Sequence, residues 1–587
     1  MKQLFVLIPM LSAFIISQAQ GSFGDIPKTV NYRDAKITDV GVVAADYYLW
    51  EVNDSTANKA DSVVTAEQYV LWQSKGDFDQ QVKIRRENAP KKGSKLKSVS
   101  TSEREGCLKD ALFATYQYMV FKYEYPSISF QGDSIMLSAI AACPTADDTS
   151  VTRDVVIGTH VTITADKQCP SNTTAGFASD DWGILMSLAG GKKIKLGWGS
   201  NLFFAIATSS TFIILPGLFP AIWGTIGISA EVVNAEPSSN YNLVILPDYE
   251  GYGTTYYRSH PYLYQELTAR QVVDATRYGI ALYKNDSATQ DFRHPLRDDF
   301  RTVCCGYSQG GSVALATQRF IEQNGLTDEL HLVGSICGDG PYDPISTLMY
   351  YVGRDLDNKK MNMAVVLPLI VKGMLDSNPY MKSHRAQEFF SQEFLDTGIM
   401  SWLTEKQKTT DDIKEAWAAQ AKAGQTTIFD TDGKAMMHDI MNEQCWAYFK
   451  SLYDQYKDNY TTTGVPLPQH RGVIEDLHLA IASNDITTGW SPSHSIMLFH
   501  STDDTVVPKT NFDKAVYAIG QESSSDWIKQ HISQLGHDHV DSGSDFFKGD
   551  DDWEILSNYT IRLFTAKKKI CDLPWNGQTT SSMPTTW

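Results

Sequence analysis

Short apolar runs alternate with helical patterns along much of this chain, and the alternation limits the folds that it can adopt. The runs read "LVILP", "TVCC", "LVGSIC" and "SIMLFH", and each is followed by a polar or glycine-rich loop. Unbroken apolar runs of this length are typical of parallel strands covered on both faces. A helical apolar face occupies residues 266–285, between the first two runs, and another helical pattern follows the second. We therefore expect an α/β fold with a mostly parallel central sheet.

The alternation stops after Pro344, which indicates how the chain is divided. Residues 345–489 contain helix-forming stretches such as "TTDDIKEAWAAQAKA" and no strand pattern of comparable strength. We interpret them as a helical cap inserted between two strands of one sheet. The predicted division is a signal peptide in 1–19, a small N-terminal region of unassigned role in 20–105, the first part of the core in 106–344, the cap in 345–489 and the second part of the core in 490–587.

The N-terminus has the pattern of a secretory signal peptide. Lys2 is followed by an apolar run from Leu4 to Ile16, and the small residues Ser17 and Ala19 come next. The run is too short to span a bilayer. We expect cleavage near Ala19 and a mature protein that is secreted or periplasmic.

Charge and composition narrow the range of partners. A formal net charge of −18 offers no basic surface for nucleic acid. The segment from Leu196 to Ala230 carries no charged side chain, but Pro216, Pro220 and several glycines interrupt it. We favour a buried strand and loop over a membrane-touching segment here. No residue spacing resembles a metal site, so neither a metal nor a cofactor is expected, and the oligomeric state is left open.

Ser308 is the candidate nucleophile. It lies in "GYSQGG", between Gly306 and Gly310, after an apolar run and before an amphipathic helical pattern. A serine held at a sharp strand-to-helix turn needs small neighbours, because side chains at the flanking positions would collide. The helix start directs main-chain N–H groups toward the site, so the N–H of Gln309 is the expected oxyanion donor.

A serine hydroxyl needs a base and an orienting acid, and in this fold class the chain order is serine, acid, histidine. The loop after "SIMLFH" presents Asp503 and Asp504, and the spacing to Val507 and Pro508 favours Asp504 as the acid. Asp503 is the alternative acid, but its simpler interpretation is that it is a residue of the turn.

Two histidines in "SQLGHDHVDSG" are candidates for the base. His537 and His539 share one loop after the expected last strand, about 35 residues beyond the acid loop. The order along the chain fits both of them, so the residues alone leave the choice open.

These motifs together resemble the secreted α/β-hydrolase family of serine esterases and lipases that includes the microbial secretory lipases. The resemblance covers roughly residues 115–344 and 485–565. Its carrying motifs are "YEYPSISFQGDSIMLSA", "PDYEGYG", "HPYL", "GYSQGG", "GWSPSHSIMLFHSTDDTVVP" and "DHVDSG".

The resemblance implies an α/β-hydrolase fold, a Ser-His-Asp triad and hydrolysis of carboxyl esters of small or lipid-like molecules. The family pattern of Asp-His followed by a small residue favours His539 over His537, because Asp538 and Gly543 complete it. The family's usual histidine-glycine motif for a second oxyanion donor is replaced by "PAIWGTIGISAE", which leaves Gly224 or Thr225 as candidates.

Two other activities stay open from the sequence. A serine peptidase of the aminopeptidase type would use the same triad, and a catalytically inactive binding protein would keep the fold. Because all three residue types of a triad are present, we expect a serine carboxylic-ester hydrolase that forms an acyl-enzyme.

Overall fold

The computed structural model describes residues 26–53, 60–71, 95–97, 105–107, 114–144, 154–175, 190–196, 232–241, 243–292, 296, 298–522 and 528–548. The predicted signal peptide, nearly all of the uncharged segment 196–230, and Gly224 and Thr225 lie outside these ranges. Within them, no helix is both long enough and apolar enough to cross a membrane.

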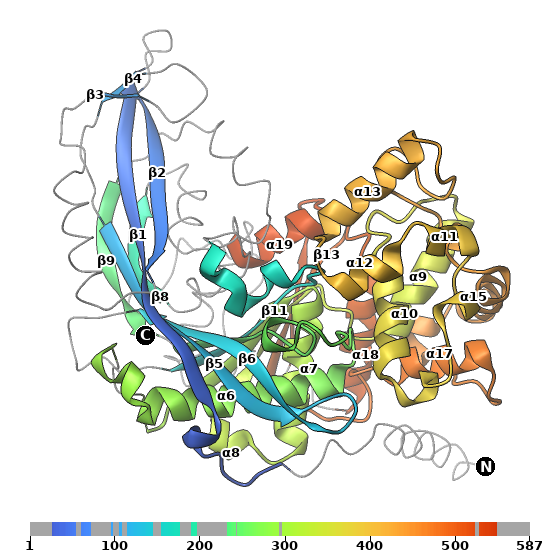
Figure 1. The fold of residues 1–587 in the computed structure, drawn as a ribbon, viewed down its shortest axis with the longest axis horizontal. Helices are drawn as coiled ribbons and strands as arrows, with labels where there is room; N and C mark the ends of the chain where they lie inside the picture. Colours follow the sequence, from blue (N-terminus) through green and yellow to red (C-terminus); the bar gives the residue numbers. More distant parts are fainter. Residues whose placement is uncertain are drawn as a thin grey trace.

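One large sheet runs through the middle of the molecule (Figure 1). Its central eight strands lie in the spatial order β5-β6-β10-β7-β11-β12-β13-β14. Their bounds are β5 (Ala114–Ile128), β6 (Ser134–Pro144), β7 (Val155–Thr159), β10 (Leu243–Pro247), β11 (Thr302–Tyr307), β12 (Leu332–Gly338), β13 (Ser495–Ser501) and β14 (Ile528–Ser533).

These eight strands form the mostly parallel sheet that the sequence predicts. Counted along the chain from β5, their spatial order is 1-2-4-3-5-6-7-8, and only β6 runs antiparallel to the others. Every residue of β7, β10, β11 and β13 is buried, which agrees with apolar runs covered on both faces. The prediction of an α/β fold is confirmed.

Further strands extend the sheet beyond β5. β1 (Lys36–Asn53) pairs antiparallel with β5, and β2 (Ala60–Leu71), β4 (Glu105–Cys107) and β3 (Lys95–Lys97) continue from it. A separate two-stranded sheet consists of β8 (Gly190–Leu196) and β9 (Val232–Tyr241). The described part of the N-terminal region therefore adds strands to the edge of the main sheet.

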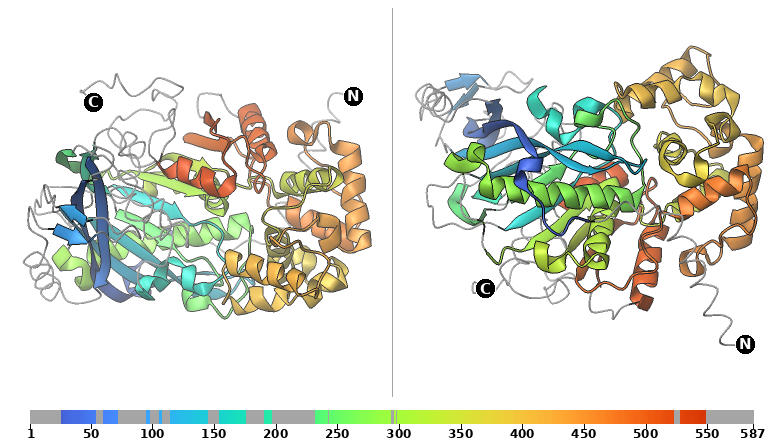
Figure 2. Two further views of the ribbon diagram at one scale, coloured as in Figure 1. Left: turned by 90° about the horizontal axis from the view of Figure 1, so that it is seen from above. Right: turned by 60° about the horizontal axis from the view of Figure 1, so that its bottom comes forward.

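Helices cover both faces of the sheet (Figures 1 and 2). On one face, α6, α7 and α18 share a core with inward side chains such as Cys304 and Leu498. On the other face, Phe546 of α19 contacts the rings of Tyr307 and Phe499. Their bounds are α6 (Gln265–Asn285), α7 (Gln309–Gln323), α8 (Thr327–Leu330), α18 (Lys509–Glu522) and α19 (His539–Lys548), with short 3₁₀ turns η1 (Tyr32–Asp34), η2 (Asp166–Gln168), η3 (Pro170–Ala175), η4 (Gly253–Thr255) and η5 (Ser287–Phe292).

A helical segment separates β12 from β13 and builds a core of its own. In that core, Trp417 stacks on Phe429 with ring centres 4.3 Å apart, and Phe394 packs beside both. The nine helices between these two strands begin at Pro344 and end at Ala482. The predicted bounds of the cap, 345–489, stay a prediction. The helices are α9 (Pro344–Leu356), α10 (Val366–Ser377), α11 (Gln392–Asp396), α12 (Ile399–Glu405), α13 (Thr410–Lys422), α14 (Met437–Ile440), α15 (Glu443–Tyr456), α16 (Tyr460–Thr463) and α17 (Val473–Ala482), with η6 (Pro379–Met381) and η7 (Ala386–Glu388).

Candidate active site

Ser308 lies at a sharp turn between β11 and α7. Its φ of 58° and ψ of −128° lie in a region that residues with a Cβ rarely adopt. A Cβ at Gly306 would lie 2.1 Å from Oγ1 of Thr159, and a Cβ at Gly310 would lie 2.1 Å from the main-chain oxygen of Thr159. Because a side chain at either position would collide with β7, both positions require glycine, as the sequence predicts.

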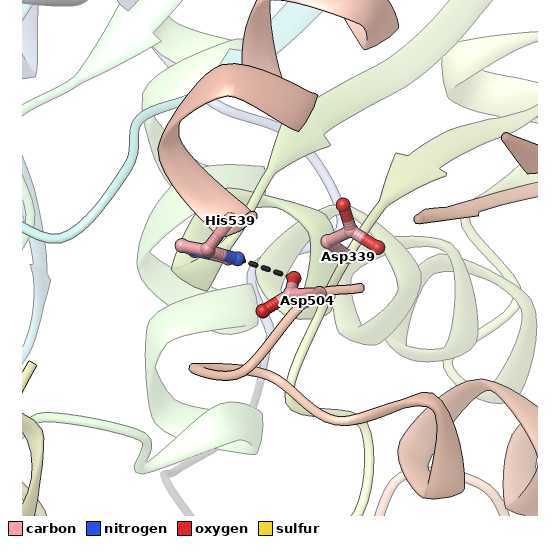
Figure 3. A group of neighbouring side chains, drawn as sticks. All are labelled: Asp339, Asp504 and His539. Atoms are coloured by element: carbon pink, nitrogen blue, oxygen red, sulfur yellow. Dashed lines mark hydrogen bonds and ion pairs between the residues drawn. The ribbon is translucent and has the colours of Figure 1, made fainter. Parts of the chain in front are cut away.

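Ser308, His539 and Asp504 meet at the carboxyl ends of three strands and the start of α19. Nε2 of His539 lies 2.8 Å from Oγ of Ser308, and Nδ1 lies 2.5 Å from Oδ2 of Asp504. Figure 3 shows the imidazole of His539 directed at the Asp504 carboxylate. The Ser308 side chain and both partners are buried, with Ser308 the most accessible at 9%.

The loop after β13 holds Asp504 in place through its own main chain. The N–H groups of Val506 and Val507 both donate to Oδ1 of Asp504 at 2.8 Å. These bonds leave Oδ2 free to accept from His539. The side chain of Asp503 is exposed instead and lies near Gly536.

The structure separates the two histidine candidates as well. His539 is the first residue of α19 and contacts Ser308 and Asp504, whereas the main-chain oxygen of His537 accepts a hydrogen bond from Ser501. Of the paired alternatives, His539 contacts Ser308, and Asp504 contacts His539.

The charges around His539 favour its protonated form. Burial alone would lower the pKa of His539, but the carboxylates of Asp504, Asp339 and Asp538 raise it above the ordinary value of 6.5. Burial also raises the pKa of Asp504, and the hydrogen bond from His539 opposes this effect. An imidazole in these surroundings is well suited to accept a proton from the Ser308 hydroxyl.

Gln309 follows Ser308 and begins α7. Its main-chain N–H lies in the first turn of the helix, where N–H groups have no partner within the helix. Its side-chain amide donates to Nε2 of His260 over 3.1 Å, and Nδ1 of His260 donates to the main-chain oxygen of Glu250 over 2.8 Å. Burial lowers the pKa of His260 to about 3, so the ring is neutral. His260 of the motif "HPYL" and Glu250 of the motif "PDYEGYG" therefore hold the side chain of Gln309, the residue after Ser308.

The loop after the third strand of the core is expected to supply a second oxyanion donor. That strand is β7, which ends at Thr159 against Gly306 of β11, and its loop begins at His160. A Cβ at Gly310 would lie 2.9 Å from the main-chain oxygen of His160, so this loop starts beside the serine turn. The candidates that the sequence offers for this donor, Gly224 and Thr225, lie outside the described residues and stay a prediction.

Asp339 is a nearby acid that the sequence motifs do not reveal. It follows β12 as Asp504 follows β13, and this parallel is the signal by which it could have been found. The ligand atoms of Asp339, Asp504 and His539 lie within 4.8 Å of one another. Their oxygens already accept hydrogen bonds from protein donors, so the group is a hydrogen-bond network in which a metal would have to displace those donors.

A cavity of about 340 Å³ opens beside His539, between the end of the sheet and the helical segment. A neighbouring open groove of about 840 Å³ shares the lining residues Asp411, Lys414 and Lys434 with it. The cavity has both apolar and polar lining residues. Its apolar lining is Met363, Ala364, Val365, Trp417, Val506 and Val540; its polar lining includes Asn362, Thr410, Asp538 and Asp541.

The comparisons with known proteins concern the fold. Neither a protein-family model nor a curated protein matches the sequence. Among solved structures, the chain is similar to the rice cell wall degrading esterase LipA from Xanthomonas oryzae, with 18% identity, a TM-score of 0.49, and coverage of 74% of this chain and 87% of that one. It is also similar to Candida antarctica lipase A, with 12% identity, a TM-score of 0.45, and coverage of 80% and 83%.

At such identities the fold assignment rests on the chain's own topology. The strand order, the single antiparallel strand among the central eight, and the serine turn after the fifth of them agree with the resemblance found in the sequence. The chain has the α/β-hydrolase fold.

Proposed function

We propose that this protein is a serine hydrolase that cleaves carboxyl esters, with Ser308 as nucleophile, His539 as base and Asp504 as orienting acid. One observation carries the proposal: the continuous hydrogen-bonded line from Ser308 Oγ through His539 to the Asp504 carboxylate, at 2.8 and 2.5 Å. The strained turn that presents Ser308 at the start of α7 supports it.

In the proposed reaction, Oγ of Ser308 attacks the carbonyl carbon of the ester while Nε2 of His539 takes the hydroxyl proton. The carbonyl oxygen becomes an oxyanion that accepts from the Gln309 N–H, a contact worth on the order of 3 kcal/mol per donor. Collapse breaks the bond to the alcohol, which leaves with the proton from Nε2. Water then attacks the acyl-enzyme with His539 as base, which releases the acid and restores Ser308.

The cavity beside His539 supports a site for one part of the ester. The segment 362–365, from the apolar stretch "MNMAVVLPLIVKGML", forms one wall of it. The other apolar stretch of the cap, "EFFSQEFLDTGIMSWL", contributes no lining residue, and its Phe390 and Phe394 pack in the core of the helical segment. We assign chain-length preference to the first stretch, since its apolar residues line the cavity and the size of the cavity limits the acyl chain that can be buried.

We further propose that the enzyme acts outside the cytoplasm on small or lipid-like esters. The signal-peptide pattern of residues 1–19 supports this location. No nucleic-acid partner and no cofactor are part of the proposal, and contact with a membrane is its less favoured variant.

Labelling with a fluorophosphonate probe tests the proposal directly. The wild-type protein is expected to react, and Ser308→Ala is expected to lose labelling and ester hydrolysis while its circular dichroism spectrum is unchanged. Undiminished labelling of the variant would place the nucleophile elsewhere.

Matched substrates separate the alternative activities. A p-nitrophenyl ester should be hydrolysed far faster than the p-nitroanilide with the same acyl group. Faster cleavage of the anilide would indicate a peptidase. A folded wild-type protein that neither reacts with the probe nor turns over either substrate would indicate a binding protein.

A further inference from the structure

Asp339 is a buried carboxylate at the end of β12, and the proposed reaction does not use it. The residue is 1% exposed, and its φ of 39° lies in the left-handed region. A buried carboxylate is costly unless donors surround it. Its contacts show which groups compensate for the burial.

Four donors from three segments converge on this carboxylate. Oδ1 accepts from the main-chain N–H of Ser501 over 3.1 Å and lies 2.5 Å from Nδ1 of His500. Oδ2 accepts from the hydroxyl of Ser542 and lies 2.7 Å from the hydroxyl of Tyr307. Burial alone would raise the pKa of Asp339, but His500 and the other donors hold it below its ordinary value.

Each of these donors lies on a segment that carries a residue of the proposed triad. Tyr307 directly precedes the nucleophile, and Ser542 follows the base by three positions in α19. His500 and Ser501 end the strand that leads to the acid. The Tyr307 hydroxyl also lies 2.6 Å from the main-chain oxygen of His539, so Tyr307 links the nucleophile segment to the base segment.

The charge of Asp339 faces the same imidazole as that of Asp504. Figure 3 shows both carboxylates beside His539, with a hydrogen bond to Asp504 alone. Asp339 therefore acts on the ring at short range without being bonded to it. A second anion at this distance in a buried site stabilises an imidazolium.

We propose that Asp339 is a positioning residue of this site: it ties together the ends of the three segments that carry Ser308, Asp504 and His539, and its charge favours the protonated form of His539. The inference rests on the proposed function, because it assigns Asp339 a part in the same reaction.

The pH dependence of the site follows from all the groups around His539. Asp504 and Asp538 face it from the acid loop and from the adjacent residue, Asp339 faces it from β12, and His500 lies behind Asp339. Only the neutral imidazole can take the Ser308 proton, so the labelling rate falls as the pH drops through the pKa of His539. Removal of the Asp339 charge should lower that pKa and move the acid limb to lower pH.

The test is the pH profile of fluorophosphonate labelling, which needs no knowledge of the natural ester. Asp339→Asn keeps the side-chain shape and removes the charge. We expect the acid limb to move down by about half a pH unit or more and the plateau rate to fall roughly tenfold. Asp503→Asn is the matched control, since its exposed charge is screened by solvent, and its profile should overlay that of the wild type.

The outcomes distinguish this inference from the proposed function. A wild-type protein that the probe does not label contradicts the proposed function. If the probe labels the wild type, and Asp339→Asn has the same acid limb and the same plateau rate, only the role of Asp339 is contradicted.

A folding defect in Asp339→Asn would move the decision to two milder variants. Tyr307→Phe and Ser542→Ala each remove one tether and keep the Asp339 charge. A plateau rate several-fold below wild type with an unmoved acid limb supports the positioning role, and wild-type rates in both overturn it.

Discussion

The side-chain amide of Gln309 donates to Nε2 of His260 over 3.1 Å. Because Nδ1 of this ring donates to the main chain, Nε2 is held as an acceptor. The ring thus orients the residue whose N–H is the proposed oxyanion donor. We expect His260→Phe, which keeps an aromatic ring but removes the acceptor, to lower kcat about tenfold with little change in KM.

A double-mutant cycle checks the link. Gln309→Met keeps the main-chain N–H and removes the amide, so it should cost about as much as His260→Phe. The double variant should lose no more than either single one. Independent, multiplying losses would show that the two residues act separately.

Asp504 and Asp503 provide a matched pair one position apart. Asp504→Asn should lower kcat by up to about 10⁴, because the amide favours the wrong tautomer of His539. Asp503→Asn removes an exposed charge and should leave kcat close to the wild-type value. Steady-state rates on one p-nitrophenyl ester decide this, and a comparable loss in both variants would contradict the assignment of the acid.

The acid limb of the wild-type rate profile should lie above pH 6.5. Nearby carboxylates raise the pKa of His539 above that value, and only its neutral form accepts the serine proton. Measured kcat/KM should therefore fall as the pH drops through this range, while circular dichroism shows an intact fold. A limb well below pH 6.5 would mean that burial outweighs the carboxylates.

Gly310 should tolerate no side chain. Its Cβ would lie 2.1 Å from a main-chain oxygen of β7, so Gly310→Ala should lower the free energy of unfolding by about 3 kcal/mol and abolish labelling. Gly520→Ala is the control, since nothing lies within 4 Å of its Cβ in α18, and it should stabilise the fold by up to about 1 kcal/mol. Urea unfolding of both variants gives the comparison.

The cavity beside His539 predicts which cap residue sets chain-length preference. Met363→Trp should reduce its volume and lower kcat/KM for longer acyl chains, up to about fourfold per lost CH₂ contact, while acetate esters are spared. Trp402 is not among the lining residues and packs against the core of the helical segment, so Trp402→Ala should leave the preference unchanged. Chain-length profiles over a series of p-nitrophenyl esters test both variants. A change of preference in Trp402→Ala but not in Met363→Trp would place the acyl site outside this cavity.

Local patterns were enough to predict the parallel strands and the serine turn. Unbroken apolar runs reflect burial on both faces, and Gly306 and Gly310 reflect the close approach of β7. The preference for Asp504 has a physical basis in the two N–H groups that follow it. Such features depend on residues within a few positions of one another.

The features that the sequence did not reveal depend on contacts between distant segments. β7 has only five residues, and its place between β10 and β11 comes from pairing with strands far along the chain. The role of Asp339 likewise depends on Tyr307, His500 and Ser542, which no spacing rule connects. The sequence shows that these residues are present, but it does not show that their side chains contact one another in the fold.

The pairing of β12 with β13 affects the order in which the candidate site forms during synthesis of the chain. Gly334 pairs with Ser495, and the whole helical segment is synthesised between them. Ser308 and His539, whose side chains touch, are 231 positions apart. During synthesis the nucleophile turn and its neighbouring strands can assemble first, whereas the acid and the base arrive only after the helices. A nascent chain thus lacks the complete proposed triad until nearly all of the described residues have been made, so under the proposed function its folding order alone delays hydrolytic activity.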